Sequence, residues 1–342
     1  MLNKIINLSF NRGIMHKITL PSKKTFTSNT GQSLLDAARD NGITFPYSCQ
    51  NGRCSACKCR ITGPSTTLFD ELGLTAEEKE NGWNLACARS AIGDITLEIE
   101  DLGELNLPLP KILPTKINSL ELVSKNVMIV TLRIPPGRNF EFIEGQYINI
   151  IGPGGIKRSY SIANHCIEYN NIEIHIKQIT GGKMSDYWFN FAKVNDLLRI
   201  NGPFGTFVLR HNVKTNIIFL ATGTGIAPIK AMIEKISTLP NELKPNSVHL
   251  FWGARYNHDL YWEPKAIMDR FYYTPVISKK DINWSGECGY VQDLMIKSIK
   301  GLSNTQVYAC GSDKMISAAK SSLKIVEYDD GNFFADAFVS SN

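Results

Sequence analysis

The pattern of hydrophobic and polar positions divides the chain into three parts. In the first part, residues 15–102, the alternating stretches "HKITL" and "DITLEIE" predict strands. The stretch "SLLDAARDNG" predicts a helix, because its apolar positions share one face and Gly42 stands where a helix would end. Thr75 and Glu78 have the spacing of a capping box, which predicts a short helix after Thr75. This part is predicted to be a compact α+β module.

The second part begins near residue 115 and consists of short strands broken by Gly, Pro and Asn. Examples are "NVMIVTLRIP", "QYINIIGP", "NIEIHIKQI" and "LLRINGPFGTFVL". Repeated short strands at this spacing predict an antiparallel β-barrel. Prolines at positions 108, 110 and 114 make residues 106–114 the candidate linker between the first two parts.

The third part, residues 213–342, alternates strands with helices. It opens with "NIIFLATGTGIAPIKAMIEKI", in which a continuous apolar run is followed by Gly-x-Gly and an amphipathic helix. Further strands are predicted in "SVHLFWGAR", "YTPVIS" and "QVYACGS", and further helices in "PKAIMDRF", "VQDLMIKSI" and "KMISAAKSSL". This alternation predicts a doubly wound α/β domain with a parallel sheet, in which ligands bind at the carboxyl ends of the strands.

Composition adds limits to this picture. The chain has 342 residues, which is more than one hydrophobic core usually serves, and its net charge is only +5. No run of Lys or Arg indicates a nucleic-acid partner. The start lacks a secretory pattern, and the apolar stretches are too short to span a bilayer. We expect a soluble, cytoplasmic protein without a membrane partner, with residues 1–14 as an N-terminal extension; the oligomeric state is not predicted.

Four cysteines lie within eleven residues, in "YSCQNGRCSACKCR". A disulfide framework is not expected in a long cytosolic chain. A structural zinc site is the stronger alternative, but it uses two Cys knuckles and only Cys54 and Cys57 form one. The spacing Cys49-x4-Cys54-x2-Cys57 with a distant Cys87 is instead typical of a plant-type 2Fe-2S cluster. Cys59 is expected to be a core thiol.

The predicted barrel contains residues suited to a flavin. In Arg158-Ser159-Tyr160-Ser161, a guanidinium can grip a phosphate, a ring can lie on the isoalloxazine and a hydroxyl can bond a ring nitrogen. Further on, "TGGKMSDYWFNF" is a Gly-rich turn that opens a helix, which suits a pyrophosphate and favours FAD over FMN. Each motif also has an ordinary interpretation. The first is then a chance surface strand, and the second a turn followed by a helix with Tyr187, Trp188 and Phe191 in the core.

The third part contains a dinucleotide motif at Gly223-Thr224-Gly225, directly between a strand and a helix, although Pro228 stands where a third glycine would be. Gly253 and Cys310-Gly311 fall at other strand ends, so we expect them to converge on one cleft. Cys310 is alternatively a plain buried thiol.

NADH versus NADPH stays open, because Arg255, Tyr256 and His258 either meet a 2′-phosphate or face solvent. The six histidines show no ligand spacing, so core or surface roles are expected for them.

Together, the three parts resemble the iron–sulfur flavoprotein reductases of the ferredoxin–NADP reductase superfamily, over residues 15–342. The resemblance implies a β-grasp 2Fe-2S ferredoxin domain at 15–105, a linker at 106–114, an FAD-binding β-barrel at 115–212 and a doubly wound NAD(P)-binding domain at 213–342. The implied cofactors are a 2Fe-2S cluster, FAD and NADH or NADPH.

The resemblance also implies site residues. The cluster ligands would be Cys49, Cys54, Cys57 and Cys87. Flavin contacts would come from Arg158, Tyr160, Ser161, His175, Ile176, Lys177, Gly182, Lys183, Met184 and Ser185. The nicotinamide dinucleotide would lie against Gly223, Thr224, Gly225, Cys310 and Gly311. Catalytic contacts would be made by Cys310 beside the nicotinamide, by Ser161, and by Phe338 in the C-terminal tail. Ser312 stands where proline is usual after Cys-Gly, which leaves the shape of that turn open.

Within this group, "EGQYINI", "ATGTGIAP", "YACGSDKMI" and "FFADAF" are similar to the reductases that serve 3,6-dideoxyhexose synthesis. This resemblance implies electron transfer from nicotinamide through FAD and the cluster to a pyridoxamine-phosphate-dependent CDP-4-keto-6-deoxyhexose 3-dehydrase. The alternative acceptor is the oxygenase component of a phenol, toluene or methane monooxygenase. A non-enzyme alternative is a redox carrier or sensor. In both enzyme interpretations, the cofactors carry out the chemistry and the protein orients them.

Overall fold

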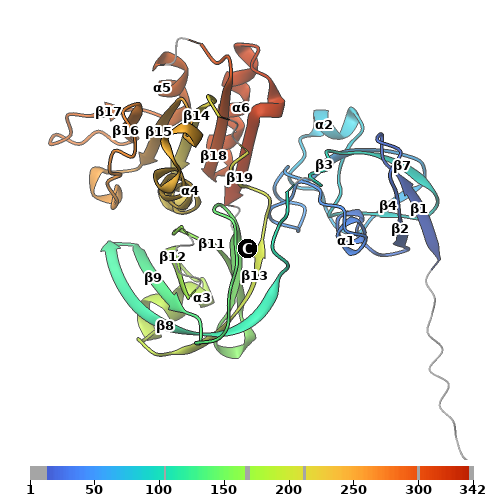
Figure 1. The fold of residues 1–342 in the computed structure, drawn as a ribbon, viewed down its shortest axis with the longest axis horizontal. Coiled ribbons are helices and arrows are strands. Elements are labelled where there is room, and N and C mark those ends of the chain that lie inside the picture. The colour runs from blue at the N-terminus through green and yellow to red at the C-terminus, as the bar shows by residue number, and fades with distance from the viewer. Residues whose placement is uncertain (1–13, 104, 166–169, 211–212, 299–300, 339–342) are drawn as a thin grey trace, which may run out of the picture. The chain divides into compact units, whose positions relative to one another are not determined.

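The computed structural model describes residues 14–103, 105–165, 170–210, 213–298 and 301–338 (Figure 1). The chain divides into two compact units, Met1–Leu105 and Asn106–Asn342. The two units are described separately below.

The first unit is built on a five-stranded sheet with the order β2-β1-β7-β3-β5. Its strands are β1 (Met15–Thr19), β2 (Thr25–Asn29), β3 (Lys58–Thr62), β5 (Trp83–Leu85) and β7 (Ile95–Glu98). A second, two-stranded sheet pairs β4 (Ser65–Thr67) with β6 (Arg89–Ala91). Strand β1 runs antiparallel to β2 but parallel to β7, which gives the mixed sheet of the β-grasp fold.

Two capped helices complete this unit. Helix α1 (Leu34–Asp40) buries its apolar face, and the Ser33 side chain accepts a hydrogen bond from the Asp36 N–H at its start. Gly42, just past its end, has φ +73°, as expected of a helix-stop glycine. Helix α2 (Ala76–Glu80) begins with the predicted capping box of Thr75 and Glu78. Both predicted helices are confirmed.

The second unit begins with a six-stranded antiparallel sheet in the order β11-β10-β13-β8-β9-β12. Its strands are β8 (Lys111–Ser124), β9 (Val127–Arg133), β10 (Tyr147–Ile151), β11 (Lys157–Ser161), β12 (Asn171–Lys177) and β13 (Leu197–Phe204). An isolated bridge between Ile162 and Ile174 joins the two edges, so the sheet closes into the predicted barrel. Strand β8 starts inside the stretch predicted as a linker, because residues from Lys111 onward pair with β13.

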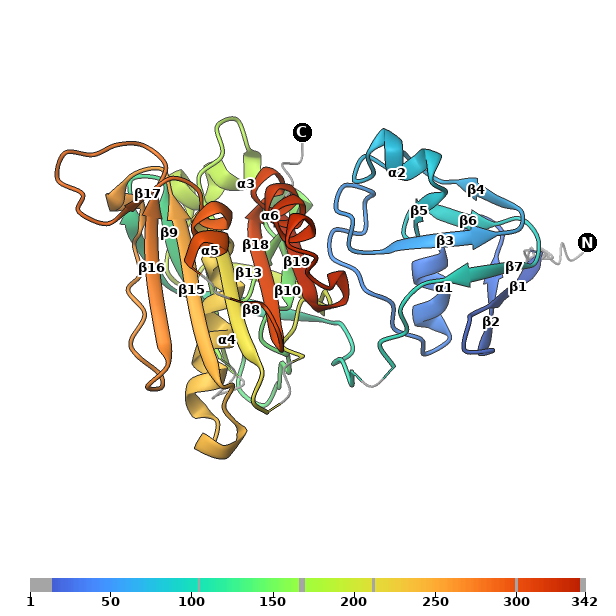
Figure 2. The ribbon, with the colours of Figure 1, turned by 90° about the horizontal axis from the view of Figure 1, so that it is seen from above.

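The rest of this unit is a six-stranded parallel sheet in the order β17-β16-β15-β14-β18-β19 (Figure 2). Its strands are β14 (Asn216–Thr222), β15 (Ser247–Ala254), β16 (Phe271–Ile277), β17 (Glu287–Cys288), β18 (Thr305–Ser312) and β19 (Phe333–Phe338). Helix α4 (Ile226–Thr238) packs into one apolar cluster with the sheet, and helices α5 (Val291–Ser298) and α6 (Asp313–Ile325) pack into another. The doubly wound arrangement is confirmed.

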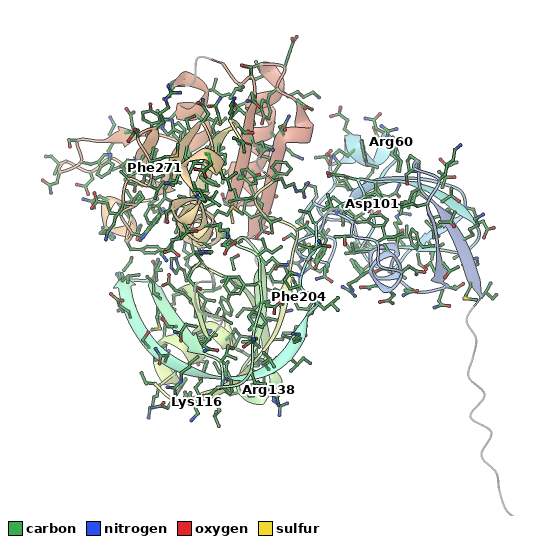
Figure 3. All side chains as sticks on the ribbon, viewed as in Figure 1. Arg60, Asp101, Lys116, Arg138, Phe204 and Phe271 are labelled. Carbon is green, nitrogen blue, oxygen red and sulfur yellow. The ribbon has the colours of Figure 1, made fainter. Side chains whose placement is uncertain are left out.

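The helix predicted in "PKAIMDRF" is wrong. Residues 261–267 have no regular secondary structure, and β16 already begins at Phe271. Figure 3 labels Phe271 among the side chains. Side chains from residue 260 to residue 271, including Leu260, Ile267 and Phe271, pack on the cluster that α4 covers. An extended segment can place all of them on the sheet at once, so tertiary packing overrides the local helical pattern. In the described part of the chain, no helix combines the length and the apolar character that crossing a membrane requires.

Candidate functional site

The first candidate site is the cysteine loop of the β-grasp unit. The N–H of Cys49 lies 3.3 Å from Cys54 Sγ, and the N–H of Cys54 lies 3.2 Å from Cys49 Sγ. Gly52, inside the loop, has φ +73°, and a Cβ there would lie 2.4 Å from the Asp70 carbonyl oxygen. Only glycine fits this tight loop, which turns its backbone N–H groups toward the sulfur atoms.

The four predicted ligands form two thiol pairs. The hydrogen bond from the Cys54 side chain lowers the pKa of Cys49 to about 6. The hydrogen bond from the Cys57 side chain likewise lowers the pKa of Cys87. Among the described residues, no three or more His, Cys, Asp or Glu side chains gather around a single ion position. A binuclear cluster takes two cysteines on each iron, and two thiol pairs fit that need.

A buried carboxylate fixes the segment that carries Cys87. Glu71 accepts hydrogen bonds from the Leu85 N–H at 2.7 Å and from Arg89 Nε and Nη2 at 3.1 and 2.6 Å. The same loop is tied to the other ligands, because the Gly73 N–H donates to the Gly52 carbonyl at 2.7 Å. Glu71 and Arg89 therefore hold both ligand-bearing segments together. Sequence reasoning missed them, since neither belongs to a motif with a fixed spacing.

Cys59 lies outside the ligand pairs. Its side chain is fully buried, with Sγ 3.6 Å from the Asn84 carbonyl, and burial raises the pKa of its thiol. This agrees with the predicted core thiol.

The second candidate site is the part of the barrel wall where the facing edges of β11 and β12 are not paired with each other, which we call the barrel opening. The two strands meet at the Ile162–Ile174 bridge, and the Ala163 N–H donates to the Glu173 carbonyl beside it at 2.8 Å. On the other side of the bridge, within the described residues, β11 is paired only with β10 and β12 only with β9. Two strand edges with backbone N–H and C=O groups therefore face this opening. Such edges can bond the polar rim of a flat heterocycle.

The predicted flavin residues lie on these two edges. Tyr160 is held by Trp188, whose Nε1–H donates to the phenol oxygen at 2.9 Å. Burial raises the pKa of Tyr160 to about 12, so the phenol stays protonated. Ser161 is buried at the end of β11, whereas Arg158 is exposed and can reach a phosphate. Trp188 orients this tyrosine, although its sequence motif did not assign it to the site.

On the other predicted flavin strand, β12, the side chains of His175 and Ile176 are engaged within the protein. Ile176 is buried in the barrel core and Lys177 is exposed. The His175 ring points to Tyr261 and Glu173 instead, with Nδ1 2.9 Å from the Tyr261 hydroxyl and Nε2 2.9 Å from the Glu173 carboxylate. The structure thus brings β12 to the site, but the His175 side chain is engaged elsewhere.

The Gly-rich turn precedes helix α3 (Lys183–Asp186), with Gly182 as its N-cap. The Ser185 hydroxyl accepts the Ile179 N–H at 2.7 Å, which closes the turn. Met184 packs in the barrel core, so its side chain is not available to a ligand, whereas the first helical turn has backbone N–H groups without helical partners. Helix α3 continues into a single π-helical turn, Tyr187–Phe191, in which Phe191 is 62% exposed and not in the core.

The third candidate site lies where β14 and β18 end. A Cβ on Gly225 would lie 2.2 Å from the Cys310 carbonyl oxygen and 2.8 Å from Gly311 Cα. A Cβ on Gly311, which has φ +142°, would lie 2.1 Å from Thr222 Oγ1. Gly253 pairs with Thr222 on the neighbouring strand. The structure brings these residues together at the strand ends, and the close backbone approach explains the glycines at 225 and 311.

Cys310 and Ser312 have clear structural roles at this edge. The Cys310 side chain is 0% exposed and packs among apolar residues, and burial raises the pKa of its thiol, which stays neutral. Ser312 caps helix α6, with φ −68° and its side chain accepting the Met315 N–H. The serine therefore gives the turn a φ that proline would also provide.

The C-terminal strand and the loop after β15 flank the same edge. Phe338 ends β19, pairs with Ser312 and is 38% exposed; the tail beyond it lies outside the described residues. Arg255, Tyr256 and His258 are exposed, and the rings of Tyr256 and His258 stack with their planes at 7°.

Comparison with known families agrees with this three-site geometry. Residues 18–91 match the 2Fe-2S iron-sulfur cluster binding domain, residues 114–209 the oxidoreductase FAD-binding domain and residues 219–321 the oxidoreductase NAD-binding domain. Among solved structures, the chain is similar to the Amycolatopsis cytochrome P450 reductase GcoB, with a TM-score of 0.74 and 24% identity over 95% of this chain and 99% of the other. That likeness concerns the fold.

The chain is thus an iron–sulfur flavoprotein oxidoreductase that uses a 2Fe-2S cluster, FAD and NAD(P)H. It is 38% identical to the CDP-6-deoxy-L-threo-D-glycero-4-hexulose-3-dehydrase reductase of Yersinia pseudotuberculosis, over 94% of this chain and 97% of the relative. Protein RfbI of Salmonella typhimurium is 35% identical over 94% of this chain and 96% of the relative. The chain belongs to the family of the Yersinia dehydrase reductase. A terephthalate 1,2-dioxygenase reductase component of Comamonas is 30% identical, over 92% of this chain and 95% of the relative.

Proposed function

We propose that this chain is the reductase of a pyridoxamine-phosphate-dependent CDP-4-keto-6-deoxyhexose 3-dehydrase, to which it delivers electrons from NAD(P)H. The observation that carries the proposal is the 38% identity to the dehydrase reductase of Yersinia pseudotuberculosis along nearly the full length of both chains. The two thiol pairs, the barrel opening and the glycine contact at the end of β14 lie in the matched domains, which supports the proposal.

We propose the following roles for the chain's own residues. Cys49, Cys54, Cys57 and Cys87 hold the cluster, with Glu71 fixing the segment around Cys87 through the Leu85 N–H. The edges of β11 and β12 hold the flavin ring, while Arg158 and the turn before α3 bind its phosphates. The Gly223–Gly225 turn binds the dinucleotide phosphates at the start of a helical segment. When bound, the cofactors supply hydride acceptance, the change from two-electron to one-electron transfer, and single-electron donation.

The physiological acceptor is tested by coupling. Purified chain is mixed with NADH or NADPH and either the dehydrase with its CDP-hexulose substrate or a candidate oxygenase component with its substrate. We expect the amount of nicotinamide oxidised to equal the amount of deoxygenated sugar formed in the mixture with the dehydrase. The mixture with the oxygenase component should give no product-coupled oxidation. Product-coupled oxidation only with the oxygenase component would instead support the second candidate, which the 30% identity to the Comamonas dioxygenase reductase component favours. Absence of any NAD(P)H-dependent dye reduction would favour a carrier or sensor.

The role of Cys310 is a separate prediction. If its side chain borders the nicotinamide, Cys310→Ala should slow flavin reduction by NAD(P)H by about tenfold, because a small displacement of the reacting ring is costly. Iron, sulfide and FAD contents should stay at wild-type levels. Anaerobic stopped-flow absorbance measures the rate. An unchanged rate would mean that the buried thiol only fills the core, as its full burial also allows.

A further inference from the structure

Two side chains from the parallel-sheet part of the second unit converge on flavin strand β12. The Tyr261 hydroxyl reaches His175 Nδ1 at 2.9 Å, and Lys230 Nζ reaches the Glu173 carboxylate at 3.0 Å. His175 and Glu173 are themselves joined, with Nε2 2.9 Å from the carboxylate oxygen. Tyr261, His175, Glu173 and Lys230 therefore form one continuous polar chain, which we call the β12 clamp.

The protonation states of the clamp follow from its bonding. Burial favours the neutral form of His175 and lowers its pKa. Burial would by itself raise the pKa of Glu173, but the His175 hydrogen bond and the Lys230 charge lower it, so the carboxylate is ionised. A carboxylate only accepts, so His175 Nε2 carries the proton, and Nδ1 accepts from the Tyr261 hydroxyl. Every bond in the clamp then has a donor and an acceptor.

Lys230 attaches the clamp to the point where the barrel closes. It lies on α4 and is almost fully buried, although lysine rarely is unless paired. Its Nζ donates to the Ala163 carbonyl at 3.1 Å and to the Glu234 carboxylate at 2.6 Å. Ala163 and Glu173 flank the bridge that ends the flavin opening. Lys230 therefore holds both edges of that opening against the helix.

Tyr261 attaches the clamp to the nicotinamide turn. Its ring packs edge-on against Trp252, with centroids 5.2 Å apart. Trp252 Nε1–H in turn donates to the Gly223 carbonyl at 3.0 Å. Strand β12 also lies directly against the Gly223–Gly225 turn. The dinucleotide turn and the flavin strand are thus linked on one side through Trp252 and Tyr261, and on the other through Lys230 on the helix that follows the turn.

We propose that the β12 clamp sets the alignment of the dinucleotide turn with the flavin opening, and that Tyr261 and Lys230 are positioning residues for hydride transfer. Neither residue needs to touch a cofactor for this role. The inference rests on the proposed NAD(P)H-to-flavin transfer. It predicts that loosening the clamp slows the hydride step while each cofactor still binds.

The mildest variant is Tyr261→Phe, which removes one hydroxyl and keeps the ring packing. Its matched control is Tyr273→Phe, because Tyr273 packs against the same apolar cluster. Lys230→Met removes the buried charge, Lys230→Arg restores a cation, and Lys235→Met changes a half-buried lysine of the same helix. The readouts are the anaerobic rate of flavin reduction at saturating NAD(P)H, the nicotinamide Kd, FAD and iron content, and hydrogen exchange of the Ala163 amide.

We expect the rate of flavin reduction to fall at least about tenfold in the Lys230→Met variant and a few-fold in the Tyr261→Phe variant. Misalignment acts on this rate rather than on binding. Lys230→Arg should recover part of the rate. Exchange of the Ala163 amide should accelerate in the Lys230→Met variant even after FAD is removed, whereas both controls behave as wild type.

Three outcomes would overturn the clamp. The first is a wild-type rate of flavin reduction in both Tyr261→Phe and Lys230→Met. The second is a change in the nicotinamide Kd with no change in that rate. Loss of FAD from Tyr261→Phe would show a role in cofactor retention instead. A wild-type protein that shows no flavin reduction by NAD(P)H would contradict the proposed function itself, and the exchange measurement would still report on the clamp.

Discussion

Replacing Cys87 with serine is expected to stop electron delivery to one-electron acceptors while NAD(P)H still reduces the flavin. Cys87 is the one predicted ligand outside the cysteine loop, and it is paired with Cys57. A plant-type cluster needs four cysteine ligands, so its loss leaves one iron incompletely held. We expect cytochrome reduction to fall to background, with iron and sulfide content strongly reduced. Bleaching of the flavin by NAD(P)H in an anaerobic cuvette should keep its wild-type rate.

Two other cysteines serve as controls for this result. Cys288 is exposed on β17, so Cys288→Ser should change neither iron content nor activity. Cys59→Ala should retain the cluster, because Cys59 is a buried thiol outside both pairs. Full iron and sulfide content in Cys87→Ser together with their loss in Cys59→Ala would show that the ligand set is assigned wrongly.

Replacing Gly225 with alanine is expected to weaken NAD(P)H binding by about 10–100-fold. The added Cβ would lie 2.2 Å from the Cys310 carbonyl oxygen, and this backbone atom cannot rotate away as a side chain would. The added Cβ must displace either the dinucleotide turn or β18. Overpacking of this kind costs about 1–3 kcal/mol, which corresponds to the expected loss of affinity. The Kd of the nicotinamide dinucleotide, measured by titration of the flavin absorbance, tests this.

The control for this prediction is Gly154→Ala. Gly154 lies in a turn of the barrel with φ +66°, where a Cβ would meet nothing within 4 Å, so this variant strains the backbone without a clash and without touching the dinucleotide turn. Both variants should retain FAD and iron. Unchanged nicotinamide affinity in Gly225→Ala would mean that the turn and β18 can separate without cost, so that their close approach is not what shapes the site.

Features that depend on neighbours along the chain were determined by the sequence. The spacing of Cys49, Cys54 and Cys57 specifies one loop around a cluster, whatever surrounds it. The capping box at Thr75 and the strand–glycine–helix pattern at Gly223 are equally local, and the structure has both. The change from alternating strands to strand–helix repeats predicted the antiparallel barrel and the parallel sheet, because hydrophobic period reflects which face each element buries.

Only the tertiary structure decided which distant side chains meet. Glu71 and Arg89, or Tyr261 and His175, are paired by strand register and loop path, and no periodicity in the sequence records such a pairing. The same reason explains the wrong helix in "PKAIMDRF": its local pattern is helical, but in the fold the stretch packs Ile267, Met268 and Phe271 against the parallel-sheet cluster without forming a helix. Local spacing identified what the chain can bind, and long-range packing determined how those sites are held.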